Sequence, residues 1–350
     1  MIVPCDDWRA GHSPGVGRRR VSATIDIMHR ALPDYVAPAG DGLFVVDTGF
    51  HRPRFDASYL LVDAGRAGFV DTGTAYGLPR LLGALDALGL ARDAVDWVIP
   101  THVHLDHAGG AGALMRELPR ARMLVHPRGA RHMIDPRALW DSATAVYGAE
   151  EMARSYRELV PVAAERVSTT HEGLQMQVGR RTLVFADTPG HARHHHCIWD
   201  EASRGWFTGD CFGLSFPELA TARGSWMLPT TTPVQFEPEV MIATIERLLA
   251  QRPRWMYLTH FGPVGGSEEQ VQRLGAQLLD VLRRMIALGE RERHHADRAE
   301  RHAALVRGEL DIYDESLRAH GGTLARDELG RLLALDLEVN AQGMAIWLDR

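Results

Sequence analysis

The sequence predicts a layered α/β protein with a helical C-terminal extension, because three patterns recur along its 350 residues. Short segments rich in Val, Leu and Phe end in Asp, Gly or Thr, as strands followed by turns do. Residues 78–89 carry leucines at helical intervals and end on Gly89, a residue suited to a C-terminal helix cap. From Ser267 onward, long charged stretches bearing leucines are helical in period and in propensity.

The predicted strands fall into two groups. GLFVVDTGF, ASYLLVDA and AGFVDTGT come before the helix at 78–89, and VDWVIPTH follows it. Later segments repeat the theme of a short apolar strand that delivers polar residues at its end, and they predict a second sheet. They are RMLVHP, RTLVFADTPGH, HHCIWD, RGWFTGD and RWMYLTH. A rigid sheet positions the loops at its strand ends, so these loops are the expected place for function.

Three regions are expected along the chain. Residues 1–25 are rich in Gly, Pro and Arg and are predicted to form a loosely tethered arm. Residues 26–266 form the predicted catalytic domain, and residues 267–350 form the helical C-terminal extension. The spacing of its leucines makes these helices amphipathic. The extension is therefore expected either to cover the mouth of the active site or to form a dimer contact.

Composition and charge exclude several classes of protein. The net charge of −6 and the lack of a long basic run beyond residues 18–20 argue against a nucleic-acid partner. No apolar run reaches the roughly 20 residues that span a bilayer, and no secretory signal is recognisable, so we expect a cytoplasmic protein without a membrane partner. Cys5, Cys197 and Cys211 fit neither a disulfide framework nor a CxxC motif and are expected to be idle thiols.

The densest polar segment is THVHLDHAGG, at residues 101–110. His102 and His104 are two residues apart, so their side chains point to one side of an extended backbone. Asp106 and His107 follow where the chain must turn, and the Gly–Gly pair after them permits a tight turn into the next helix. Imidazole and carboxylate donors suit zinc and also iron or manganese, and burying them without a cation would be costly. The segment therefore predicts a metal site.

This segment resembles the HxHxDH signature of the metallo-β-lactamase superfamily. Further landmarks of that family follow in order: TPGH, FTGD and YLTHFG supply His191, Asp210 and His260. The resemblance covers roughly residues 26–266. It implies a four-layer αββα sandwich and a site that holds two divalent metal ions, with zinc expected and iron or manganese as alternatives.

The resemblance also implies a role for each ligand. His102, His104 and His191 would hold the first metal, and Asp106, His107 and His260 the second, with Asp210 as the bridge. A water shared by two such ions becomes a hydroxide nucleophile at neutral pH and attacks a carbonyl whose oxygen is polarised by metal. Asp106 is in addition the expected catalytic residue, because it is placed to orient the hydroxide and receive a proton.

Two further residues are candidate partners of the ligands. Asp71, in FVDTGT, matches a strand-end aspartate of the family and is expected either to support a ligand histidine or merely to form a turn. His195 is expected to contact a ligand or the substrate, whereas its neighbours His194 and His196 are interpreted as structural. The remaining histidines considered are left out of the site: His126, His132, His171, His294, His295 and His302.

The substrate is predicted to be a small molecule with a thioester, a lactone or a related ester or amide. True β-lactamases of this superfamily usually carry Cys or Ser where this chain has Asp210, so the sequence is more similar to glyoxalase II-like thioesterases and lactonases. The basic glutathione-binding tail is missing. The alternative is an iron-loaded member that handles oxygen or sulfur. Five aromatic residues are expected to line an apolar pocket, or else to pack in the core: Trp140, Tyr147, Phe212, Phe216 and Trp226.

Overall fold

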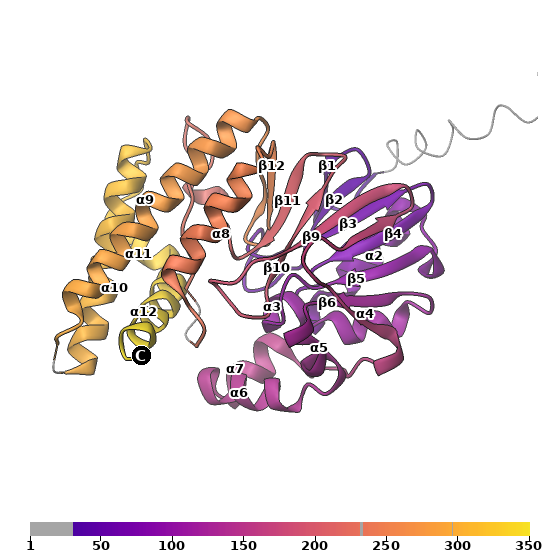
Figure 1. The fold of residues 1–350 in the computed structure, drawn as a ribbon, viewed down its shortest axis with the longest axis horizontal. Helices are drawn as coiled ribbons and strands as arrows, with labels where there is room; N and C mark the ends of the chain where they lie inside the picture. The colour runs from indigo at the N-terminus through magenta and orange to yellow at the C-terminus, as the bar shows by residue number, and fades with distance from the viewer. Residues whose placement is uncertain (1–30, 232–233, 296) are drawn as a thin grey trace, which may run out of the picture.

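The computed structural model describes residues 31–231, 234–295 and 297–350 (Figure 1). The predicted N-terminal arm and Cys5 lie outside these residues. Within them, two β-sheets face each other in the middle of the molecule, and helices cover both outer faces. The predicted αββα sandwich is therefore confirmed, with further helices at the C-terminal end.

The first sheet has seven strands within the described residues, in the order of the sequence. They are β1 (Val36–Gly40), β2 (Leu43–Asp47), β3 (Ala57–Asp63), β4 (Arg66–Val70), β5 (Val95–Ile99), β6 (Arg122–Val125) and β7 (Val167–Thr169). The segment RMLVHP, which was grouped with the second sheet above, supplies β6. That grouping was wrong, because β6 pairs in parallel with β5 after a helical crossover.

The second sheet has six strands within the described residues, in the order β13-β12-β11-β10-β9-β8. They are β8 (Gln175–Val178), β9 (Arg181–Asp187), β10 (His196–Asp200), β11 (Gly205–Gly209), β12 (Trp255–Leu258) and β13 (Gly262–Gly265). Four of the five late segments named from the sequence are strands of this sheet.

The layers follow from the two-residue period of the strands. In β2, Leu43 and Val45 face a core between the two sheets, whereas Phe44 and Val46 face a core under the outer helices. Both faces of the strand are buried, because each sheet of the sandwich has the other sheet on one face and helices on the other. A third core lies between the second sheet and the C-terminal helices, and it includes Trp206 of β11 together with buried residues of α8 (Pro238–Ala250) and α9 (Glu268–Glu292).

Short helices connect the strands of the first half. They are α2 (Leu78–Leu88), α3 (Leu105–Ala108), α4 (Ala111–Glu117), α5 (Pro127–Ile134), α6 (Arg137–Tyr147) and α7 (Ala149–Glu151). Gly89 ends α2 with φ 68°, so the predicted C-terminal cap is confirmed. After α9, the C-terminal region continues with α10 (Arg298–Ala319), α11 (Arg326–Leu332) and α12 (Ala334–Leu348). Its helical nature is confirmed, while its division from residues 26–266 as a separate domain stays a prediction.

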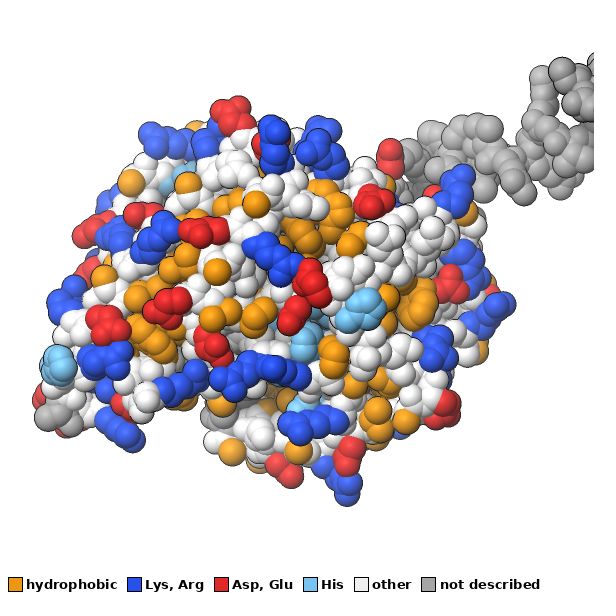
Figure 2. All heavy atoms as spheres, viewed as in Figure 1, with side chains coloured by type: hydrophobic (Ala, Val, Ile, Leu, Met, Phe, Trp, Pro, Cys, Tyr) orange, Lys and Arg blue, Asp and Glu red, His pale blue; other side chains and the backbone are white. Residues whose placement is uncertain are grey.

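The surface shows no single-sign face in the view of Figure 2, where basic and acidic side chains are interspersed. Among the described residues, no helix is both long enough and apolar enough to cross a membrane. The absence of a nucleic-acid partner and the cytoplasmic location stay predictions.

A buried acid in α10 makes stability depend on pH. Glu309 is completely buried, and neither of its carboxylate oxygens has a hydrogen-bond partner in the structure. Burial raises its pKa well above the usual range, and Glu338 on α12 raises it further. Because the folded pKa exceeds the unfolded one, the stability that this group contributes is present below about pH 4.5 and is lost as the pH rises through the folded value.

We therefore expect Glu309→Gln to stabilise the protein by about 1–3 kcal/mol at pH 8 and by little at pH 4.5, because the amide is neutral without the proton that Glu309 must take up on folding at high pH. Urea unfolding across this pH range measures the difference. Glu315→Gln is the matched control: it lies on the same helix but pairs at the surface with Arg284, so a change within about 1 kcal/mol at any pH is expected. A pH-independent effect of Glu309→Gln would contradict the argument.

Candidate metal centre

The strands bring the predicted ligands to one edge of the sandwich. In the first sheet, β4 and β5 are parallel, so the residues that follow them, Asp71 and the segment 101–107, meet at the same edge. In the second sheet, β9, β11 and β12 run in one direction, because β10 is antiparallel to both β9 and β11. The loops after these strands carry His191, Asp210 and His260 to that edge as well.

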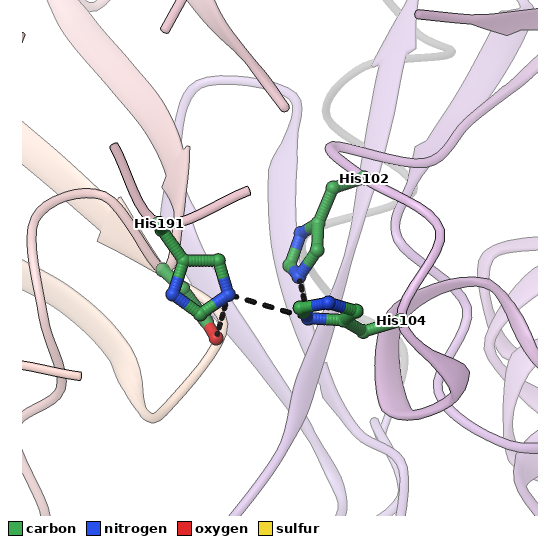
Figure 3. A group of neighbouring side chains, drawn as sticks. His102, His104 and His191 are labelled. Carbon is green, nitrogen blue, oxygen red and sulfur yellow. Dashed lines mark hydrogen bonds and ion pairs between the residues drawn. The ribbon is translucent and has the colours of Figure 1, made fainter. Parts of the chain in front are cut away.

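Four of the predicted ligands form the first cluster. The rings of His102, His104 and His191 converge on one point (Figure 3). His104 Nδ1 lies 2.8 Å from His102 Nε2 and 3.2 Å from His191 Nε2, and His191 Nε2 lies 3.3 Å from Asp210 Oδ2. Ligand atoms that share a tetrahedral zinc at bond lengths near 2.1 Å are separated by about 3.4 Å. This cluster is therefore close to the size of a metal coordination shell.

The second cluster contains Asp106, His107 and His260. Asp106 Oδ2 lies 3.6 Å from His107 Nε2 and 3.3 Å from His260 Nε2. Asp210 reaches this cluster too, since its Oδ1 lies 3.3 Å from His107 Nε2 and 3.7 Å from His260 Nε2. The two oxygens of Asp210 thus face different clusters, which is the arrangement that a bridging carboxylate needs.

The second nitrogen of four of these rings is held by a neighbour. His102 Nδ1 lies 3.2 Å from Thr101 Oγ1, and His191 Nδ1 lies 2.8 Å from Thr230 Oγ1. The carbonyl oxygen of Phe55 is 2.9 Å from His260 Nδ1. Such outer contacts fix the ring orientation and the tautomer of a metal-binding histidine, leaving the inner nitrogen free to bind.

Asp71 holds the fourth ring and joins three strand ends. Its Oδ2 lies 2.9 Å from His107 Nδ1 and accepts a hydrogen bond of 2.7 Å from Thr259 Oγ1, while its Oδ1 accepts one of 2.7 Å from the backbone N–H of Thr101. Asp71 has a positive φ of 55°, which aspartate tolerates better than most residues. Of the two readings offered from the sequence, the structure favours support of a ligand histidine over a simple turn.

The first cluster presents neutral rings at pH 7. Burial lowers the pKa of His104 to about 3 and that of His191 to about 4, and it places the pKa of His102 well below its usual value. A neutral imidazole has a free lone pair at the inner nitrogen, which is the form that binds a metal.

The second cluster is held as ion pairs. Burial raises the pKa of Asp106, but His107 and His260 lower it by more, so that the carboxyl is ionised. Burial lowers the pKa of His260, but the hydrogen bond to Asp106 and the charge of Asp210 raise it to about 9 overall. The protons on these imidazoles supply the positive charge that the two carboxylates need. Binding of a dication by the same atoms releases those protons.

Two buried atoms at the centre favour a cation over an ordinary polar core. His107 Nε2 and Asp210 Oδ1 are both buried without a hydrogen bond, although they lie only 3.3 Å apart. Buried polar atoms rarely stay unpartnered in native proteins, and a bound ion is a common reason when they do. Five imidazoles and two carboxylates with no thiolate fit zinc, iron or manganese as ligands.

His195 lies behind the centre rather than in front of it. It is fully buried, its Nδ1 lies 2.8 Å from Thr188 Oγ1, and its Nε2 accepts a hydrogen bond of 3.3 Å from the backbone N–H of Asp210. It does not line the cavity described below, so of its two expected roles the geometry agrees with contact to the predicted ligand Asp210. Cys197 and Cys211 are buried free thiols beside it, as expected.

A cavity of about 630 Å³ opens onto the metal centre. Five of the seven predicted ligands line it: His104, Asp106, His191, Asp210 and His260. His132 and His194, which the sequence does not place in the site, line it too, and so does His51, which no sequence pattern indicates. Nothing in the local sequence distinguishes these three histidines, because it is the fold that turns them towards the cavity.

Of the two roles expected for the five aromatic residues, the structure shows core packing for those it describes. Phe212, Phe216 and Trp226 are almost completely buried in the core under the C-terminal helices, and Trp140 packs against the same core. The side chain of Tyr147 lies outside what the structure describes. The aromatic residues that do line the cavity are Phe50, Phe55 and Tyr156. An aromatic residue in a loop can pack in the core or line a cavity, so the sequence alone does not distinguish these two roles.

The family model described as the metallo-beta-lactamase superfamily matches residues 51–260, which is more than half of the chain. The chain belongs to this superfamily. The match includes every predicted ligand, so the resemblance seen in the HxHxDH segment is confirmed.

Similar proteins agree with this membership. The metallo-beta-lactamase fold-containing protein ST1585 of Sulfurisphaera tokodaii is 24% identical over 217 residues, covering 57% of this chain and 78% of that protein. Its solved structure superposes with a TM-score of 0.59 at 20% identity, covering 87% of this chain and 98% of that one. The family protein TTHA1429 of Thermus thermophilus gives a TM-score of 0.57 at 22% identity, with coverage of 85% and 95%. These likenesses support the fold.

An activity is named for some of the similar proteins. The acyl-coenzyme A thioesterase MBLAC2 of Bos taurus is 28% identical over 185 residues. The match covers 49% of this chain and 63% of that enzyme, so the two proteins share less than two thirds of the length of the relative.

Proposed function

We propose that this protein is a dinuclear metal-dependent hydrolase that cleaves a thioester, a lactone or a related ester or amide of a small molecule. The observation that carries the proposal is the position of Asp210, whose two oxygens face two separate clusters of ligand atoms at the floor of one cavity. The thioesterase among the similar proteins favours a thioester.

Each half of the centre has a set of residues to hold one ion. His102, His104 and His191 would hold the first, Asp106, His107 and His260 the second, and Asp210 both. Two divalent ions bound there would lower the pKa of water to near neutrality and polarise a carbonyl oxygen. Zinc is the proposed metal, because histidine and carboxylate ligands without thiolate form most catalytic zinc sites.

Asp106 is the proposed catalytic residue. Its side chain is 25% exposed, whereas the side chains of His107 and Asp210 are 0% and 9% exposed. It is therefore the acidic ligand that is most open to the cavity, and it is ionised at neutral pH. A carboxylate in this position orients the attacking water and accepts its proton. No serine or cysteine nucleophile is required.

Metal analysis followed by a substrate panel tests the proposal. Protein purified without added metal is expected to contain two zinc ions per chain and to hydrolyse thioesters or lactones. Turnover is expected to fall at least about 100-fold on chelation and to return with zinc, because the ions generate the nucleophile. Circular dichroism before and after chelation checks that the fold persists.

The panel also separates the competing functions. β-Lactams and phosphodiesters are expected to remain uncleaved. Coloured, oxygen-responsive iron would favour the oxygen- or sulfur-handling alternative, and metal-replete protein that cleaves only phosphodiesters would favour a nuclease. Either result would overturn the proposal.

A further inference from the structure

The cavity above the metal centre has two opposing helical walls. Ala138, Leu139 and Ala143 of α6 line one side, and Leu335 and Val339 of α12 line another. Figure 1 shows both helices in the lower part of the molecule, α12 in yellow at the C-terminal end of the chain and α6 in magenta from its first half. The metal ligands lie at the floor, where Phe55 stacks edge-on against His260 at 5.5 Å.

Beyond the metal centre the lining is mainly apolar, although it also includes Arg131 and Glu151. Phe50, Tyr156 and Leu214 are buried around the floor. Towards the rim, Val234 is 61% exposed and Leu335 is 46% exposed, and these are two of the five large hydrophobic side chains found exposed in the described residues. Apolar side chains that rim a cavity are the kind of surface that an apolar ligand covers on binding.

The wall formed by α12 is fixed in place. Asn340 Oδ1 accepts a hydrogen bond of 2.7 Å from the backbone N–H of Thr231, and Asn340 Nδ2 donates one of 3.0 Å to the carbonyl of Pro229. One turn further on, a Cβ added to Gly343 would lie 2.5 Å from Thr231 Oγ1, so the helix and this loop are in close contact. The loop in turn supplies Thr230, which holds His191. The helix is thereby joined to the metal centre through the loop.

The acid that α12 adds to the lining is consistent with an apolar surrounding. Asp336 faces the cavity between Leu335 and Val339, and its side chain has no hydrogen bond or ion pair with another of the described residues. Burial raises its pKa to about 7.

From these features we infer that the substrate carries an extended hydrophobic acyl group, and that this group lies in the chamber between α6 and α12 while its carbonyl reaches the metal centre. This inference rests on the proposed function and names its substrate class. The C-terminal helices are then a specificity element, because α12 closes the chamber that the rest of the fold leaves open. A cavity of this volume with mainly apolar walls is typical of small-molecule sites that bury most of their ligand.

Filling the chamber tests the inference. The probes are N-acetylcysteamine thioesters of acetate, butyrate, hexanoate and octanoate, assayed with the zinc-loaded protein. For the wild type, kcat/KM is expected to rise roughly fourfold for each methylene that the chamber buries. Ala143→Phe and Val339→Phe, from opposite walls, are each expected to lower kcat/KM for octanoyl at least about tenfold while changing acetyl by less than about twofold.

Two further variants complete the design. Ala145→Phe is the matched control, because Ala145 is on α6 but is exposed and does not line the cavity. This variant is expected to leave kcat/KM unchanged for both the acetyl and the octanoyl thioester. Val339→Ala enlarges the chamber and is expected to move the preference to longer chains. A wild type that prefers acetyl, or filled variants that lose acetyl and octanoyl equally while Val339→Ala leaves the preference unchanged, would overturn the inference.

Binding separates this inference from the proposed function. Calorimetry with octanoate and acetate measures the chamber without any turnover. One possible result is that no thioester is cleaved but octanoate binds at least about tenfold more tightly than acetate, and that Ala143→Phe removes this difference. That result would contradict the proposed function and support the inferred binding of an acyl group in the chamber. If octanoate and acetate bind with equal affinity, the inference of an acyl-binding chamber is contradicted, whether or not thioesters are cleaved.

Discussion

Replacing Asp210 with alanine is expected to lower kcat/KM about 10³-fold or more and to leave fewer than two metal ions per chain. The reason is geometric. Asp210 Oδ2 belongs to the cluster of His191, and Asp210 Oδ1 belongs to the cluster of His107 and His260. Losing one preorganised charged group at a reacting centre costs a factor on this scale, and here the same substitution also weakens two ion sites.

Metal analysis by mass spectrometry and steady-state kinetics on the same preparation measure both effects. Asp187→Ala is the matched control: Asp187 also ends a strand and lies 3.2 Å from a histidine, His126, but its side chain is 55% exposed and it is outside both clusters. That variant is expected to keep two ions and full turnover. An Asp210→Ala protein that binds two zinc ions and turns over normally would show that the carboxylate does not bridge.

The metal centre was the part of this protein most open to prediction from sequence. Four of its predicted ligands lie within six residues, so the chain itself holds them near one another, and few structural roles demand such a segment. The other three stand at strand ends in short motifs with glycine. Parallel strands carry these ends to one edge of the sandwich, which is why the ligands meet although His107 and His260 are far apart in sequence.

The cavity could not be predicted in the same way. Its walls come from α6 and α12, which are separated by nearly two hundred residues and share no motif. Leu335 and Val339 have the same helical spacing as the leucines that pack in the core of that region, so only the packing of α12 decides which side chains face the cavity. Tertiary packing also decides that Phe216 lies in the core and Phe55 lines the cavity, although their stacked rings have centroids only 5.2 Å apart.

The two halves of the chain depend on each other through these contacts. The first sheet supplies four predicted ligands, the second sheet supplies three, and the C-terminal helices hold the loop that orients His191. The expectation that the extension covers the active-site mouth agrees with the cavity lining, whereas a dimer contact stays a prediction. The geometry of the candidate metal centre therefore depends on packing between segments from the whole described chain.

Replacing Asp71 with alanine is expected to destabilise the metal-loaded protein by about 3–5 kcal/mol and to weaken zinc binding about 10- to 100-fold. Asp71 is 1% exposed and touches no predicted metal position directly. Its loss leaves the backbone N–H and the hydroxyl of Thr101, the hydroxyl of Thr259 and Nδ1 of His107 buried without their acceptor. Each such group costs about 1–3 kcal/mol when unsatisfied, and relaxation of the cavity left behind limits the sum.

Urea unfolding and zinc competition with a chromogenic chelator measure the two effects. Asp71→Asn should fall between wild type and alanine, because the amide oxygen still accepts from Thr101 while its NH₂ group meets the donors of Thr259 and His107. Asp96→Ala is the surface control, because Asp96 pairs with Arg66 and both side chains are 31% exposed. This variant is expected to lower the free energy of unfolding by about 1 kcal/mol or less. A turn-forming role alone for Asp71 predicts lower stability with unchanged zinc affinity, so that result would remove Asp71 from the metal centre.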